Sequence, residues 1–64
     1  RAAFDELLQH NPDYVPAHFM RARLIEQEGD REAAIAAYDA GIRTAQRVGD
    51  QHAAGEMMAA RDAL

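Results

Sequence analysis

Three short interruptions divide this chain into four segments of helical length. The first interruption contains Pro12, and proline disfavours helical geometry at the residue before it. The other two begin with Gly29 and Gly49, each followed by an aspartate. Glycine is typical of the residue after a helix, and aspartate of the N-cap of the next one. Within the segments, apolar residues recur at spacings of three and four, which indicates one face of a helix. The chain is therefore predicted to be all-α, with helices over 2–10, 15–28, 31–48 and 50–64.

The residues at the segment ends predict how each helix begins. Asp13 and Asp30 are the expected N-caps of the second and third helices, and the fourth helix is expected to open with Asp50. Pro16 suits the first turn of the second helix, where its missing N–H does no harm. The connections are short, so consecutive helices are expected to be antiparallel neighbours. Since no run of alternating apolar and polar residues is long enough for a strand, no sheet is predicted.

The segment 28–42 is unusually rich in small residues. It contains five alanines, and Gly41 lies where a helix interior is expected. Glycine costs roughly 1 kcal/mol at such a position. Small side chains let two helix axes approach closely, within the usual range of about 8–10 Å. We therefore expect Gly41 to lie at a helix contact, made either with the segment before the third helix or with the one after it.

Composition and charge argue against several classes of function. The net charge of −4 argues against a nucleic-acid surface, which usually needs a basic patch. No apolar run reaches the length of about 18 residues that a membrane span needs, so no membrane insertion is expected. The chain has no cysteine, which excludes disulfides and thiolate metal sites and fits a cytoplasmic protein. Abundant alanine, with arginine as the only basic residue besides histidine, is typical of a GC-rich bacterial genome.

The sequence also offers little catalytic chemistry. His10, His18 and His52 lie on three different segments, and none has a second histidine at metal-binding spacing. The acidic residues within 26–32 lack the spacing of a calcium loop and are better explained as a solvated edge. The chain contains neither serine nor cysteine, so the usual nucleophiles are missing. We therefore expect no enzyme, no metal and no cofactor.

Residues 16–42, "PAHFMRARLIEQEGDREAAIAAYDAGI", resemble the tetratricopeptide repeat (TPR), a helix–turn–helix unit of 34 residues. Ala22 and Ala34 match the small packing positions of its two helices, and Gly29 matches the turn between them. Tyr38 matches the aromatic position that follows. Gly41 lies where the family usually has alanine. The resemblance assigns a packing role to all five residues.

The same register fits again 34 residues earlier, where Phe4 corresponds to Tyr38 and Pro12 to the proline between repeats. The resemblance implies a single TPR-like domain over 1–64, in which antiparallel hairpins stack as an α-solenoid. Glu56 would occupy a small packing position of a further repeat, so the last segment is assigned as a capping helix. The chain then resembles the C-terminal end of a bacterial TPR protein. Its parts are the second helix of a preceding repeat (1–14), one full repeat (15–48) and the capping helix (50–64).

The resemblance implies a protein–protein interaction scaffold that binds a peptide or protein partner without catalysis. In this family the first helix of each repeat lines the concave face of a superhelix. Carried over by register, the concave positions are Pro16, Phe19, Arg23, Glu26 and Gln27. Phe19 is the candidate apolar anchor, and Arg23 the candidate partner of a carboxylate.

Two alternatives remain open. The first is self-association into a homodimer, because the first segment lacks a partner helix of its own and one side of Phe4, Leu7 and Leu8 is then left uncovered. The second is an accessory domain of a larger protein.

Overall fold

The computed structural model describes residues 2–64; Arg1, assigned above to the segment 1–14, lies outside them. The described residues form four α-helices and no β-strand. The helices are α1 (Ala2–His10), α2 (Val15–Gln27), α3 (Arg31–Val48) and α4 (Gln51–Asp62). The prediction of an all-α chain with four helices is therefore confirmed. The second and fourth helices end slightly earlier than predicted.

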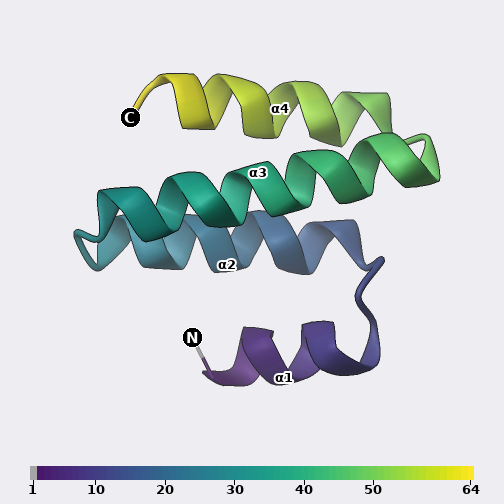
Figure 1. The fold of residues 1–64 in the computed structure, drawn as a ribbon, viewed down its shortest axis with the longest axis horizontal. Helices are drawn as coiled ribbons and strands as arrows, with labels where there is room; N and C mark the ends of the chain where they lie inside the picture. Colours follow the sequence, from purple (N-terminus) through teal and green to yellow (C-terminus); the bar gives the residue numbers. More distant parts are fainter. Residues whose placement is uncertain (1) are drawn as a thin grey trace.

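The helices lie side by side in chain order, and each runs antiparallel to the one before it (Figure 1). The α2–α3 and α3–α4 interfaces are the most extensive, whereas α1 packs on α2 over a smaller area. The helix α3 lies between α2 and α4, which touch each other only slightly. Each helix thus packs mainly on its neighbours in the sequence.

The predicted N-cap at Asp30 forms, and Asp50 caps the fourth helix in the same way. The Oδ1 atoms of Asp30 and Asp50 each accept a hydrogen bond, from the backbone N–H groups of Ala33 and Ala53 respectively, both at 3.1 Å. The preceding helices end at glycines in the left-handed region, with φ of 88° at Gly29 and 82° at Gly49. A side chain is strained there, which explains why glycine occupies the turns.

The predicted cap at Asp13 is wrong. The N-cap of α2 is Tyr14, which makes no side-chain capping bond, and Pro16 lies in the first turn. Asp13 lies one residue before the N-cap of α2, and its carboxylate makes a different contact. Its Oδ1 accepts a hydrogen bond from Arg47 Nη2 at 2.6 Å, and this bond joins the α1–α2 connection to the end of α3. The Arg47 guanidinium holds the pKa of Asp13 below its usual value.

The core is built largely from small side chains. Ala22 of α2 and Ala34 of α3 have no exposed surface, and Tyr38 is only 1% exposed. The buried cluster also contains larger side chains, chiefly Ile25 of α2 and Met57 of α4. The core between α2, α3 and α4 therefore combines alanines with a few bulky apolar side chains, as close packing requires.

Gly41 lies where three helices meet. A Cβ atom built on it would be 2.6 Å from Met57 Sδ in α4 and 3.0 Å from His18 Cβ in α2. Both distances are shorter than ordinary van der Waals contact, so any side chain here displaces a neighbour. The sequence left open which neighbour Gly41 meets, and the structure places it against both.

Candidate functional site

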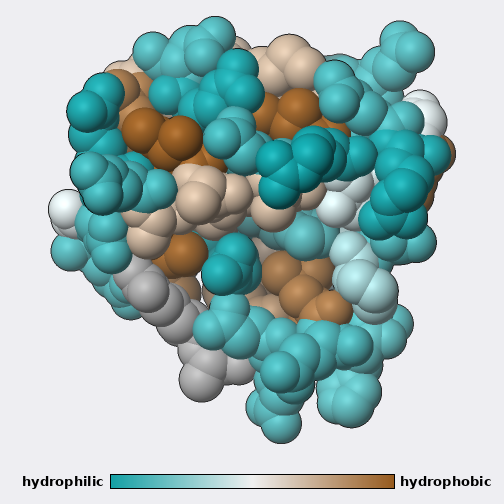
Figure 2. All heavy atoms as spheres, in the orientation of Figure 1, coloured by the Kyte–Doolittle hydropathy of each residue, from teal (hydrophilic) through white to brown (hydrophobic). Residues whose placement is uncertain are grey.

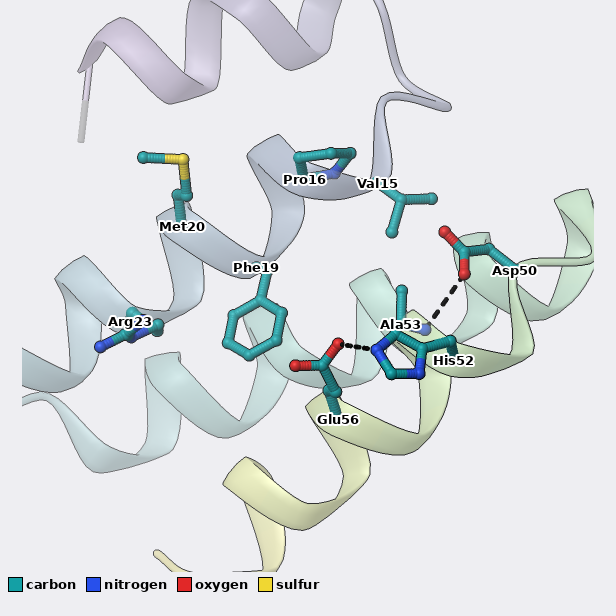
Figure 3. A pocket seen from close by; sticks show the side chains of 9 residues that line it. All are labelled: Val15, Pro16, Phe19, Met20, Arg23, Asp50, His52, Ala53 and Glu56. Atoms are coloured by element: carbon teal, nitrogen blue, oxygen red, sulfur yellow. Dashed lines mark hydrogen bonds and ion pairs between the residues drawn. The ribbon is translucent and has the colours of Figure 1, made fainter.

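A shallow groove of about 430 Å³ lies between α2 and α4 (Figure 3). We call it the α2–α4 groove. Nine residues line it: Val15, Pro16, Phe19, Met20 and Arg23 from α2, and Asp50, His52, Ala53 and Glu56 from α4 and its N-cap.

The centre of the groove is apolar. Phe19 projects into it from α2 and is half-buried. Its ring and that of Tyr38 in α3 form a T-shaped pair, with centroids 6.1 Å apart and planes at 79°. This contact with the buried Tyr38 restricts the orientation of the Phe19 ring. Met20, the next residue of α2, is 55% exposed. The groove therefore offers one fixed aromatic ring beside one adaptable thioether side chain.

The charged groups on the two sides of this apolar centre have opposite signs. In Figure 3, Arg23 lies on one side of Phe19, whereas Asp50 and Glu56 lie on the side of α4. Glu56 Oε1 lies 2.8 Å from His52 Nε2, one helical turn away. Asp50 uses one carboxylate oxygen to cap α4. The groove thus has a cationic end and an acidic edge.

The structure brings together three of the five residues predicted for the concave face. Pro16, Phe19 and Arg23 line the α2–α4 groove. Gln27 instead lines a smaller hollow between α1 and α2, which Arg23 also borders. Glu26 is exposed, and its Oε1 accepts a hydrogen bond from the Tyr38 hydroxyl at 2.8 Å. Glu26 therefore links α2 to α3 rather than lining the groove.

The Tyr38–Glu26 contact changes the acidity of the phenol. Tyr38 is buried in the core, and its hydroxyl donates to a carboxylate. Burial, together with the hydrogen bond and charge of Glu26, raises the pKa of Tyr38 to about 12. The fold thus favours the neutral phenol that supports Phe19.

Sequence reasoning missed the contribution of α4 to this site. The spacing of His52 and Glu56, four residues apart, indicates that they share a helix face. Nothing local in the sequence indicates that this face borders Phe19, because that depends on how α4 crosses α3. Met20 was also missed; it borders both the α2–α4 groove and the hollow beside α1.

Within residues 2–64, no group of three or more histidine or carboxylate side chains is arranged to hold a metal ion. None of the four described helices combines the length and apolar character needed to cross a membrane.

Comparisons of the chain with protein-family models, with curated proteins and with solved structures gave no match. The resemblance to TPR proteins therefore depends on the residue pattern.

Proposed function

We propose that this chain is a protein–protein interaction scaffold of TPR type, which binds a peptide or protein segment in the α2–α4 groove. The arrangement of small residues supports the TPR part of this proposal. Ala22 and Ala34 are fully buried, Tyr38 is nearly so, and Gly41 lies at a three-helix junction. Gly29 forms the turn between α2 and α3 with positive φ. These are the roles that the repeat assigns to the five positions, and stacking of α4 on the hairpin extends it as a solenoid would.

The position of Phe19 is the observation that carries the binding role. Its ring packs against Tyr38 and also lines the groove, which the exposed Met20 lines as well. An aromatic ring fixed in advance loses little conformational entropy when a partner covers it. Burying one apolar side chain of a partner here contributes about 1.5–3 kcal/mol. A partner therefore needs one apolar anchor and further polar contacts for useful affinity.

Binding rather than catalysis fits the groups that line the groove. They comprise one guanidinium, two carboxylates and one imidazole, with no serine or cysteine in the whole chain. The side chain of His52 is 87% exposed, and that of Glu56 is 53% exposed. Groups so open to water lack the desolvation that adapts titratable residues to catalysis.

The test uses two matched substitutions at exposed apolar residues. Met20→Glu places a charge in the groove, whereas Val48→Glu places one near the C-terminal end of α3, outside it. Both side chains are about half exposed, at 55% and 47%. Peptides selected from a random displayed library on the wild-type chain should lose at least about tenfold in affinity with Met20→Glu and change little with Val48→Glu.

The groove assignment fails if both variants bind the selected peptides as the wild type does. Circular dichroism of both variants checks that they remain helical, so that lost binding is not mistaken for unfolding.

Self-association is a second candidate, and the exposure of α1 favours it. Leu7 is 36% exposed, and Phe4 and Leu8 are half-buried. Figure 2 shows apolar surface along the junction between α1 and the other helices, bordered by hydrophilic side chains. Sedimentation velocity across a dilution series tests this candidate, and a monomer at every concentration would exclude it.

A further inference from the structure

We propose that the segment bound in the α2–α4 groove carries a cationic side chain one helical turn from its apolar anchor. This inference rests on the proposed function, and it adds the chemical class of the partner. The cation would face Glu56 and Asp50 on α4 while the anchor covers Phe19.

The distribution of charge around the groove supports a cationic partner. Two carboxylates and one guanidinium line it, and both carboxylates belong to α4. In Figure 3 they lie on the opposite side of Phe19 from Arg23. A segment that lies across the ring therefore meets negative charge at its α4 end and positive charge at the other. This polarity fixes the direction of binding, because the reversed segment would bring like charges together.

Glu56 is the carboxylate best able to receive the cation. The contact with His52 uses one of its oxygens, Oε1, at 2.8 Å. A carboxylate has acceptor capacity for several donors, so a guanidinium or ammonium group can bind beside the imidazole or replace it. The side chain of Glu56 is about half exposed, which allows a ligand to reach it without first opening the fold. Asp50 contributes mainly charge, since one of its oxygens already caps α4.

The same charges disfavour the other occupants. An acidic segment in the same orientation would bring its carboxylates against Glu56 and Asp50. A second copy of this chain carries a net charge of −4, so two copies repel each other before they meet. A basic, apolar segment of another protein matches both the ring and the charge.

The experiment separates the charge preference from groove binding itself. Three displayed libraries of short peptides share a fixed leucine and differ at one position, one helical turn after it, which is arginine, glutamine or glutamate. Each library is selected on the wild-type chain at low salt, where exposed ion pairs are least screened. An exposed ion pair changes affinity by roughly two- to fivefold. We expect the arginine library to enrich over the glutamine library by about that factor, and over the glutamate library by more.

Two variants of one residue and a matched control assign the effect to Glu56. Glu56→Gln should remove the advantage of the arginine library, and Glu56→Lys should transfer it to the glutamate library. Glu32→Gln removes an equal charge at the exposed start of α3, outside the groove, and should leave the preference unchanged. Transfer of the preference by Glu56→Lys cannot result from unfolding, because an unfolded chain would select none of the libraries.

Each other outcome overturns the inference in a distinguishable way. Equal enrichment of the three libraries, or a preference for glutamate on the wild type, refutes the cationic partner and leaves groove binding intact. Failure of all three libraries on a folded chain refutes this inference together with the proposed function. A dimer of the free chain that Glu56→Lys abolishes would identify a second copy as the occupant and refute it as well.

Discussion

Gly41 and Met57 meet so closely that a single methyl group on the glycine would lie 2.6 Å from the Met57 sulfur atom. Met57 is fully buried, so the sulfur has little room to move away. On the other side, His18 Cβ would be 3.0 Å from the same methyl group. The spacing of α2, α3 and α4 therefore depends on the absence of a side chain at Gly41.

The first prediction compares two glycines inside helices. Gly41→Ala should lower the free energy of unfolding by about 1–3 kcal/mol, because overpacking outweighs the gain in helix propensity. Gly55→Ala is the matched control, since a Cβ at Gly55 meets nothing within 4 Å. It should raise the free energy of unfolding by about 0.5–1 kcal/mol. Urea denaturation measures both values.

A second measurement tests whether the sulfur atom is the cause. Combining Gly41→Ala with Met57→Ala should cost less than the sum of the single changes, because the shortened side chain makes room for the methyl group. Equal stabilisation by Gly41→Ala and Gly55→Ala would contradict the close packing.

The second prediction concerns alkaline pH. Burial and Glu26 raise the pKa of Tyr38 to about 12, above the value of about 10 in an unfolded chain. The folded state therefore favours the protonated phenol. This contribution to stability is fully present below pH 10 and is lost as the pH rises towards 12. Denaturation at several pH values should show stability falling over this range.

Tyr38→Phe is the control for the alkaline effect. It removes the titrating hydroxyl while keeping the ring against Phe19, and Tyr14 is present in both proteins. The fall in stability between pH 10 and pH 12 should be much smaller in the variant. The same pH dependence in both proteins would show that another group causes it.

The third prediction compares two aspartates near helix starts. Asp30 caps α3, and replacing an N-cap aspartate by alanine typically costs about 1 kcal/mol. Asp13 makes only an exposed ion pair with Arg47, so Asp13→Ala should cost less than Asp30→Ala. Salt should reduce the effect of Asp13→Ala. If Asp13→Ala proved the more costly of the two, its side chain would be acting as a cap in solution.

The pH dependence of the Asp13–Arg47 pair has a defined sign. Arg47 lowers the pKa of Asp13 in the folded chain. Its contribution is therefore present above the ordinary pKa of aspartate and is lost as the pH falls through the lowered value. Asp13→Asn should remove this part of the acid dependence.

The fourth prediction concerns local opening of α1. Among the described helices, α1 packs on α2 alone, and less extensively than α3 packs on α2 and α4. Leu7 is partly exposed on it. Native-state hydrogen exchange should therefore show the amides of α1 exchanging at least about tenfold faster than those of α3. Equal protection of the two helices would indicate that something covers α1 in solution, as self-association requires.

The helices and most of their ends could be predicted because local rules determine them. Gly29 and Gly49 have positive φ, and Asp30 and Asp50 cap the helices that follow. Asp13 shows where such rules fail. The chain offered a plausible cap, but Arg47, 34 residues away, provides a charged partner for the same carboxylate. A contact between residues so far apart cannot be read from local spacing.

The candidate site could be predicted on one side only. The resemblance to the TPR assigned Pro16, Phe19 and Arg23 to one face of α2, and all three line the groove. The contribution of α4 depends on how that helix crosses α3, which Gly41 and Met57 determine through their contact. Glu26 shares the predicted face, yet the phenol of Tyr38 engages its carboxylate.

Because each helix packs mainly on its neighbours in the sequence, the chain never has to close a long loop in order to fold. Chains with such local contacts usually fold within microseconds to milliseconds, because little entropy is lost before the first stabilising contacts form. During synthesis, the α2–α3 hairpin can form as soon as both helices have left the ribosome, before α4 is complete. The α2–α4 groove then comes into existence last, when α4 docks on α3.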